Sequence, residues 1–427
     1  MLKSAIRRLL RGLRFLMLLA LMVVLLQWSS VPLGLRWYAV AAIAQDYQFD
    51  YLTWTLNALL VKLDQTLYGR HPFMTEADRS AFVRAYMADL ERARRLEAEI
   101  AALYTDPQVT DPDTAAAALR QERETLRTDL RQRQPLAEAI LEGQVAAALV
   151  EQGFGVAGQI LPPVAAHFTQ VPNLLVVSPR DVIRFDVSIN LEPMTAEAIA
   201  ALEAQVDAQQ DVSSLVVPLG GIALYPAMIL ETASIPWALE TIAHEWLHHY
   251  LFAFPLGLSY FDDESFAAET RIINETVASL FGRELGQLAL ARYYPDLLPP
   301  PPSQPTAAPL AAPAPAFDFG RELDATRRRV DALLAEGRVA EAEAYMEARR
   351  RLFYDQGYPI RKLNQAYFAF YGGYQSGAPG AGGADPIGPA VQAIRDASPS
   401  LHAWVVTMRG ITSRQELIEV RDRLTRP

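Results

Sequence analysis

One apolar run near the amino terminus constrains this chain more than any other feature. Phe15–Leu26 contains only apolar side chains, and the apolar character continues to Leu35 with polar interruptions at Gln27, Ser29 and Ser30. A helix over these 21 residues just spans the hydrocarbon core of a bilayer, which is about 30 Å thick. The run therefore predicts one transmembrane helix, followed by a much longer body that folds outside the bilayer.

Charges around this run predict its orientation. Residues 1–44 carry six basic and no acidic side chains, and five of these bases precede the run. By the positive-inside rule, the amino terminus is cytoplasmic and the body is extracytoplasmic. We expect an uncleaved signal anchor, because Ala42-Ile43-Ala44 lies too far beyond the apolar core for typical signal-peptide processing. Cleavage near Ala44, which would release a secreted body, and a buried core helix are the alternatives.

The composition of the body excludes several classes of protein. The chain has 39 basic and 49 acidic residues, and the part after residue 44 carries a net charge of −16. Such a body does not bind nucleic acid through a general phosphate-neutralising surface. The chain has no cysteine, which excludes disulfides, thiolate metal sites and a cysteine nucleophile. Its length and its 51% of apolar residues allow two or three domains with sizeable cores.

Local patterns predict a mostly helical body with strands in its middle. Short β-branched runs bounded by turn residues predict strands at 174–177, 185–189 and 215–217. A stretch with eight prolines at 299–316 predicts an extended linker or surface loop. Apolar residues recur at helical spacing over 76–104, 114–150, 237–294, 320–352, 389–397 and 414–425. We therefore expect an α+β fold that is mostly helical, with a small mixed sheet and flanking helical hairpins.

The residues suited to chemistry gather in one short segment. Three of the six histidines fall within His244-Glu245-Trp246-Leu247-His248-His249. On a helix, His244 and His248 lie one turn apart on the same face and can bind one metal ion together. Glu245 is displaced by about 100° around the helix and can reach a metal-bound water without binding the metal. The preceding Ser234-Ile235-Pro236 predicts the start of that helix.

A catalytic zinc site needs a third protein ligand and one open position. With no cysteine and a single later histidine, His402, a carboxylate is favoured. Glu275 is the best placed, because apolar residues surround it at helical spacing and a buried carboxylate needs a cation or an ion pair. An ion pair with Arg271 or Arg283 is the alternative role for Glu275. The other nearby carboxylates are Asp262, Asp263, Glu264 and Glu269, of which Glu269 is the reserve ligand.

This pattern resembles the gluzincin metallopeptidases, the group of thermolysin and the related zinc aminopeptidases. The resemblance rests on HEWLHH followed by Asn274-Glu275-Thr276-Val277-Ala278 and covers about residues 215–285. It implies that His244, His248 and Glu275 bind Zn²⁺ and that Glu245 is the general base. The chain departs from the pattern in two respects. There are 26 residues between His248 and Glu275, somewhat more than in those enzymes, and Ser279 stands where thermolysin-like enzymes have an Asp.

The same resemblance implies roles for three further segments. The residues from Gly220 to Pro226 are similar to the edge strand that pairs with an extended substrate, so Gly221, Ile222 and Ala223 are the expected substrate-binding residues. Gluzincins also stabilise the oxyanion with a Tyr or His from a later segment. Tyr371 is the choice for this role among Tyr367, Tyr371 and Tyr374. We expect His249 beside the ligands or on the surface. The segment from Lys362 to Tyr367 resembles bacterial sequences labelled aminopeptidases.

These features together predict a membrane-anchored, extracytoplasmic zinc metallopeptidase with a zincin-like core. Its partners would be a peptide or protein substrate and the lipid bilayer, and its oligomeric state is unknown. A non-catalytic surface or assembly protein with a metal-stapled helix pair is one alternative, and a zinc hydrolase of non-peptide substrates is the other. The expected divisions are a basic tail and anchor at 1–44, a helical region at 45–159, the metallopeptidase core at 160–298, the linker or loop at 299–316, and a helical region at 317–427 that completes the cleft.

Overall fold

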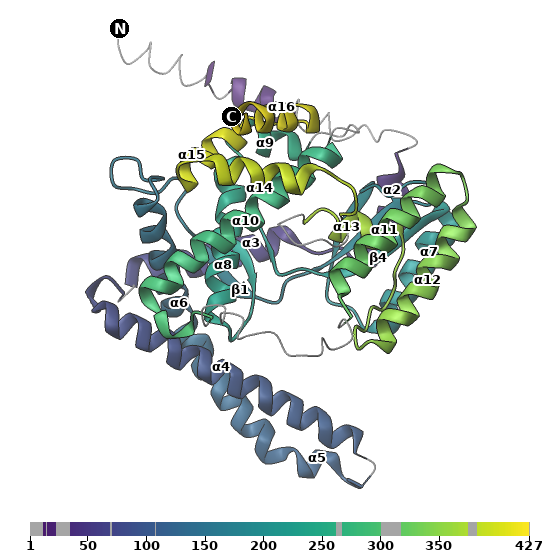
Figure 1. The fold of residues 1–427 in the computed structure, drawn as a ribbon. Coiled ribbons are helices and arrows are strands. Elements are labelled where there is room, and N and C mark those ends of the chain that lie inside the picture. Colours follow the sequence, from purple (N-terminus) through teal and green to yellow (C-terminus); the bar gives the residue numbers. More distant parts are fainter. Residues whose placement is uncertain are drawn as a thin grey trace, which may run out of the picture.

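The computed structural model describes residues 12–13, 15–22, 35–68, 71–106, 108–261, 267–299, 317–374 and 382–426. Over these residues the chain is mostly helical and forms two small three-stranded sheets, which confirms the predicted α+β class (Figure 1). Residues 23–34 of the predicted anchor lie outside this part, as do residues 300–316 of the proline-rich stretch. No helix in the described ranges is long and apolar enough to cross a membrane.

The strands predicted from β-branched runs form an antiparallel sheet. Its central strand is β2 (Asn173–Pro179), which pairs with β3 (Val187–Leu191) on one side and β4 (Val212–Pro218) on the other. Side chains alternate between the two faces of a strand, and both faces of β2 are buried. Apolar residues therefore follow one another without interruption in this strand, as they do where helices cover both sides of a sheet.

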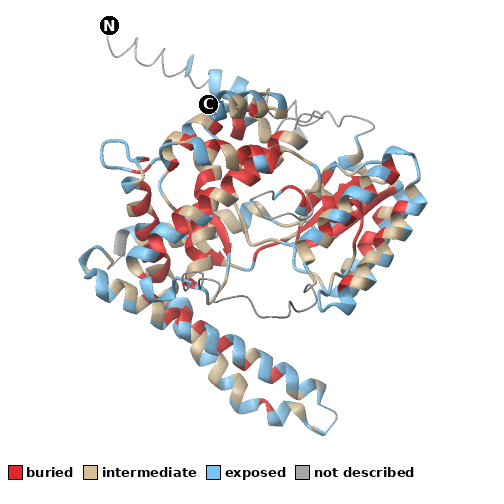
Figure 2. Ribbon diagram, in the orientation of Figure 1, coloured by how far each residue is buried: buried red, intermediate tan, exposed pale blue. Residues whose placement is uncertain are grey.

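Helices from distant parts of the sequence cover the two faces of this sheet. One face, which includes Leu175 and Val177, packs against α2 (Arg36–Ile43) and α7 (Ala196–Gln210). The opposite face, with Leu174 and Val176, packs against three later helices, and Figure 2 shows the buried strands between the helical layers. These helices are α11 (Phe319–Ala335), α12 (Val339–Asp355) and α13 (Gln365–Tyr371).

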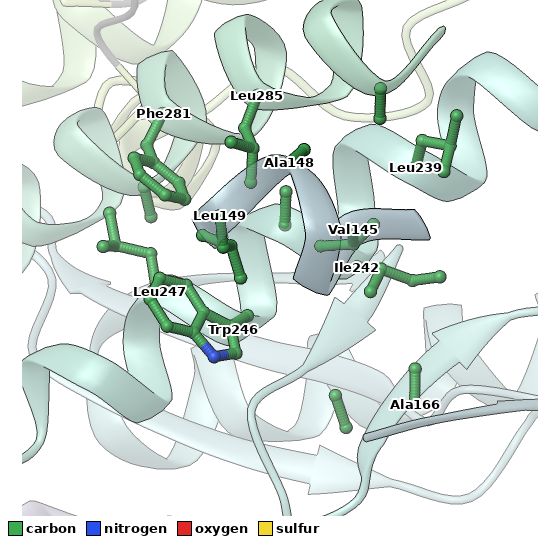
Figure 3. Packing of buried hydrophobic residues seen from close by; sticks show 14 of the residues in the cluster. Val145, Ala148, Leu149, Ala166, Leu239, Ile242, Trp246, Leu247, Phe281 and Leu285 are labelled. Atoms are coloured by element: carbon green, nitrogen blue, oxygen red, sulfur yellow. The ribbon is translucent and has the colours of Figure 1, made fainter. Parts of the chain in front are cut away.

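A larger helical body lies beside this sheet and contains the histidine-rich segment. At its centre, α8 (Ile235–Leu251) packs against α10 (Ala267–Tyr293). Figure 3 shows Trp246 and Leu247 of α8, Phe281 of α10 and Leu149 of α6 in the shared core. The surrounding helices are α3 (Tyr51–Tyr68), α4 (Glu76–Thr105), α5 (Pro112–Ala115), α6 (Ala117–Glu151), α9 (Pro255–Leu258), α14 (Ile387–Ala397), α15 (Leu401–Met408) and α16 (Arg414–Thr425).

Both helical hairpins predicted from the sequence are present. The first pairs α4 with α6 and projects from the helical body in Figure 1, whereas the second pairs α11 with α12. A turn at Gly337, whose φ is +73°, separates α11 from α12, and glycine adopts this left-handed conformation without strain. The hairpins therefore lie where the apolar spacing indicated.

The second sheet is small and mixed, and it belongs to the helical body. β6 (Ala227–Leu230) is its central strand and pairs in parallel with β1 (Ala166–Thr169) and antiparallel with β5 (Gly221–Ile222). β5 is therefore an edge strand of this sheet. The predicted small mixed sheet is present, but the strands at 174–177, 185–189 and 215–217 form the other, antiparallel one.

The packing of the core cuts across the divisions expected from the sequence. Apolar residues of 83–149 share one core with those of 235–294 and 387–417. The antiparallel sheet, in contrast, shares its core with 323–370 and not with the histidine-rich helix. Segments that share a core are therefore far apart in the sequence. Linkers and turns mark boundaries along the chain, but they do not show which apolar faces pack together.

Candidate metal centre

The histidine-rich segment is a helix because its sequence contains both a start signal and a buried face. Ser234 caps the first turn of α8 by accepting a hydrogen bond from the Trp237 backbone N–H at 3.3 Å, and Pro236 lies within that turn. Leu247 and Ile242 are buried in the core of the helical body. Burial of this face fixes the rotation of the helix and places His244 and His248 toward α10.

Two glycines set a short separation between α8 and α10. A Cβ atom on Gly282 would lie 2.8 Å from the Glu240 carbonyl oxygen and 2.9 Å from His244 Cβ. A Cβ atom on Gly286 would lie 2.9 Å from Glu240 Cα. Any larger residue would push the helices apart. The close approach brings Glu275, which lies two helical turns before Gly282, to the level of the two histidines.

Three candidate ligand atoms from these helices form a nearly equilateral triangle. His244 Nε2 lies 3.1 Å from His248 Nε2, and Glu275 Oε2 lies 3.6 Å from His244 Nε2 and 3.5 Å from His248 Nε2. Ligands at about 2.0–2.1 Å from a tetrahedral Zn²⁺ are separated by about 3.4 Å. The triangle therefore fits three corners of such a tetrahedron and leaves the fourth corner for water or substrate.

Charge in this triangle favours a bound cation. Glu275 is 7% exposed; the Tyr260 hydroxyl donates to its Oε1 at 3.1 Å, while Oε2 faces both imidazoles. Without a metal ion, burial disfavours the charged forms of both His248 and Glu275, but their opposite charges attract each other. Their attraction raises the pKa of His248 to about 9 and lowers the pKa of Glu275 well below its ordinary value. A divalent cation would supply the same positive charge without protonating the imidazoles.

Glu245 is a buried carboxylate next to this triangle. It is 5% exposed, and no group in the described ranges donates a hydrogen bond to its carboxylate. Burial raises the pKa of Glu245, with nearby His244 and His248 opposing the shift. A Cβ atom on Gly221 would overlap this carboxylate, so a larger residue there would displace the Glu245 side chain. A buried carboxylate in this state is costly to the fold and typical of a residue that takes up and releases protons.

A cavity of about 1070 Å³ opens onto the triangle and Glu245. It lies between the helical body and the β3 side of the antiparallel sheet, so both parts of the molecule contribute to its wall. The catalytic candidates therefore face a space large enough for several residues of a peptide. Beyond them, its lining includes Trp37, Phe185, Asp186, Asn190, Tyr260, Arg271 and Tyr374.

The predicted substrate strand borders this cavity. Gly221 and Ile222 form edge strand β5, and Ala223 follows them in the lining. His249, on the side of α8 toward this strand, donates from Nε2 to the Leu224 carbonyl oxygen at 2.6 Å. Burial lowers the pKa of His249 to about 4, so it remains neutral near pH 7. His249 thus holds the end of the edge strand and is not brought to the triangle.

In the described part of the chain three tyrosines line the cavity, Tyr225, Tyr260 and Tyr374, but Tyr371 does not. The Tyr371 ring packs against Tyr367 and Phe370, with centroids 4.5 and 5.0 Å apart. Tyr374 lines the cavity; although 39% of this residue is exposed, desolvation and the charge of Glu275 raise the pKa of its hydroxyl well above the ordinary value. α13 ends at Tyr371 and the chain turns at Gly372-Gly373, so helical spacing could not show which tyrosine faces the cavity.

The other carboxylate candidates are not near the triangle or lie outside the described residues. Glu269 accepts a hydrogen bond from the Arg414 backbone N–H at 3.2 Å, and its Oε1 lies 3.4 Å from Arg414 Nε. Asp262, Asp263 and Glu264 lie outside the described part. The sequence does not single out Tyr260, and it does not favour Tyr374 over Tyr371, because no motif marks a tyrosine that reaches a site from a loop.

Comparison with known proteins adds no relatives. No family model matches the sequence, and no curated protein or solved structure is significantly similar to it.

Proposed function

We propose that this protein is a zinc metallopeptidase, held outside the cytoplasm by its amino-terminal segment, that hydrolyses peptide bonds. One observation carries the proposal: three ligand atoms with the spacing of a zinc site lie beside a buried carboxylate, in a cavity bordered by an edge strand. Structural zinc sites are usually closed by four protein ligands, whereas catalytic sites keep one position open. Within the described residues the site has three ligands, and this arrangement favours catalysis over a metal staple.

The residues around the cavity have distinct roles in this proposal. His244, His248 and Glu275 would hold Zn²⁺, which would lower the pKa of a water molecule and polarise the scissile carbonyl. Glu245 accepts the proton of the attacking water and transfers it to the leaving nitrogen. Its raised pKa suits this exchange, because a base with a very low pKa would accept the proton poorly.

Two further groups position the substrate and stabilise developing charge. The backbone of Gly221, Ile222 and Ala223 can pair with an extended peptide at the edge of the mixed sheet. Tyr374 keeps its proton near neutral pH, because its pKa is raised, and can donate a hydrogen bond to the developing oxyanion. Tyr260 orients Glu275 through the hydrogen bond to its Oε1. We assign the oxyanion role to Tyr374, in place of Tyr371.

The test compares the full-length protein in detergent with two matched variants. Wild type is expected to bind one Zn²⁺ per chain and to cleave members of a peptide library. Glu245→Gln should keep the zinc and lose cleavage, whereas Glu269→Gln, on the same helix as Glu275 but paired with Arg414, should keep both. Cleavage that survives Glu245→Gln overturns the assignment of the base.

The same experiment separates the two alternatives. Stoichiometric zinc with no cleavage of any substrate supports a metal-stapled surface or assembly protein. Turnover of small amide or ester probes without peptide cleavage supports a hydrolase of non-peptide substrates. Each result would overturn the peptidase proposal.

The membrane location is tested separately in cells that express the chain. We expect the protein in the membrane fraction, resistant to alkaline carbonate, with the body accessible to protease from the extracytoplasmic side. Release of the body into the medium would favour cleavage near Ala44 instead.

A further inference from the structure

Arg271 is a cation in the cavity wall that is held by aromatic rings. Its Cζ atom lies 3.8 Å from the centre of the Phe185 ring and 4.9 Å from the centre of the Tyr260 ring. No carboxylate of the described residues forms an ion pair with it. A guanidinium held over aromatic rings keeps the N–H donors along its edge available, in a geometry that matches a carboxylate.

The carboxylates that line the cavity already have other partners or roles. Three of them line it in the described part of the chain: Asp186, Glu245 and Glu275. Asp186 pairs with Arg36 and lies 3.6 Å from Arg184. Glu275 is directed to the imidazoles and Tyr260, and Glu245 has the role of the base. The described lining thus offers a cation for a substrate carboxylate but no remaining anion for a substrate amine.

Arg271 lies close to the proposed reaction centre. It is one helical turn before Glu275 on α10, which places the two Cβ atoms about 5–6 Å apart. Tyr260 connects them, because its ring lies under the Arg271 guanidinium while its hydroxyl donates to Glu275. A substrate group bound by Arg271 would therefore be within one or two residues of the scissile bond.

We propose that Arg271 binds a carboxylate of the substrate and makes the enzyme selective for peptides with a negative charge next to the cleaved bond. This inference rests on the proposed peptidase function and adds a substrate class to it. The carboxylate can be the carboxy terminus of a short peptide or the side chain of Asp or Glu, because the guanidinium recognises the same group in both.

The experiment uses two pairs of peptides and the full-length, zinc-loaded protein. One pair differs only in a free or amidated carboxy terminus, and the other, amidated in both members, differs in Glu or Gln beside the cleaved bond. We expect wild type to prefer the charged member of at least one pair by about 10- to 100-fold in kcat/KM, mainly through KM. The pair that shows the preference identifies the source of the carboxylate.

Substitutions of Arg271 separate binding from a structural role. In Arg271→Gln the ratio between the charged and neutral peptides should fall to about one. Arg271→Lys should retain part of the ratio, since it keeps the charge but loses the planar fork. A structural role would slow both peptides by the same factor and leave the ratio unchanged. An unchanged ratio in Arg271→Gln, or equal rates for both pairs in wild type, overturns the inference.

A binding measurement distinguishes failure of this inference from failure of the proposed function. In the Glu245→Gln background, charged and neutral peptides are titrated directly by calorimetry. Tighter binding of the charged peptide by about tenfold or more, lost when Arg271→Gln is added, supports the carboxylate site even if no peptide is cleaved. Equal affinities overturn it, whether or not wild type has peptidase activity.

Discussion

Two clusters of buried charged residues in this molecule have similar compositions but differ in how their charges are compensated. The first, which we term the structural network, consists of Lys62, Glu138, Glu142 and His167. The second, the metal-site cluster, consists of His244, Glu245, His248 and Glu275. Each contains two glutamates and at least one histidine within the helical body, and they differ in one member, a lysine in the first and a second histidine in the second.

In the structural network the chain supplies its own cation and hydrogen bonds. Lys62 Nζ lies 2.7 Å from Glu138 Oε2 and 2.7 Å from Glu142 Oε1. The backbone N–H groups of Phe168 and Ala166 donate to Glu138 and Glu142, each at 2.8 Å. Burial alone would raise the pKa of Glu138, but Lys62 and His167 lower it to about 2. The network therefore ties α3 and α6 to the strand β1.

In the metal-site cluster Glu275 is contacted by Tyr260 and the two imidazoles, whereas Glu245 has no such partner. No lysine or arginine in the described ranges forms an ion pair with Glu245 or Glu275, and Glu245 receives no hydrogen bond there. Protonation of His248 supplies one positive charge for the two buried carboxylates, whereas a divalent cation would supply two. Ligand spacing and a carboxylate without a partner therefore mark the second cluster as the candidate metal site.

The largest expected effect is on catalysis. Glu245→Gln should reduce kcat by about 10³-fold or more, because the amide cannot accept the proton of the attacking water. Its free energy of unfolding should not fall, since the substitution removes a buried charge without a hydrogen-bond partner. Steady-state kinetics and urea denaturation of the same preparations measure both. A clear loss of stability together with residual activity would show that Glu245 has a structural role.

The corresponding substitution in the structural network should lower stability and leave catalysis unchanged. Glu138→Gln is expected to lower the free energy of unfolding by about 3–5 kcal/mol, because it leaves Lys62 and other buried donors without their acceptor. Zinc content and kcat/KM of the folded fraction should remain close to wild type. Urea denaturation and metal analysis check this prediction, and loss of zinc in folded Glu138→Gln would contradict it.

The effect of metal removal on thermal stability should depend on the metal-site cluster and not on the structural network. With free Zn²⁺ at about 100 times its Kd, binding stabilises the folded state by about 3 kcal/mol, so a chelator should lower the melting temperature. Glu275→Gln should lose most of this response, whereas Glu138→Gln should keep it. Calorimetric scans with and without chelator measure the shift. An equal response in all three proteins would mean that the stabilising ion binds elsewhere.

The smallest effect is a pH dependence of stability. The pKa of Glu138 is about 2 in the folded protein against an ordinary 4.5, so its ionised form stabilises the fold above about pH 4.5. This contribution is lost as the pH falls from 4.5 toward 2. The difference in unfolding free energy between wild type and Glu138→Gln should therefore shrink over that range. A difference that stays constant from pH 6 to pH 3 would contradict the assigned charge of Glu138.

The sequence allowed the local parts of the site to be predicted. Helical spacing placed His244 and His248 on one face, and the apolar residues around Glu275 indicated a buried carboxylate on a second helix. The structure brings these three side chains together. Their close contact also needs Gly282 and Gly286, whose role becomes visible only when the two helices are placed side by side.

Features that join distant segments could not be predicted in this way. Lys62 lies 76 residues from Glu138, and no periodicity connects a cation on one helix with an acid on another. Arg271 meets Phe185 from a different part of the fold, and Tyr374 reaches the cavity only because α13 ends before it. The two sheets likewise recruit partners far away in the sequence. These contacts depend on long-range packing, which cannot be read from local sequence patterns.

X-ray absorption spectroscopy of the zinc-loaded, full-length protein tests whether His244, His248 and Glu275 bind zinc. We expect one Zn²⁺ per chain with two imidazole nitrogens, one carboxylate oxygen and one further light atom at about 2.0–2.1 Å. Glu275→Gln should lose the carboxylate and most of the affinity, while Glu245→Gln should leave the spectrum unchanged. Absence of stoichiometric zinc, or a spectrum that is unaffected by replacing His244, His248 or Glu275, would contradict the account.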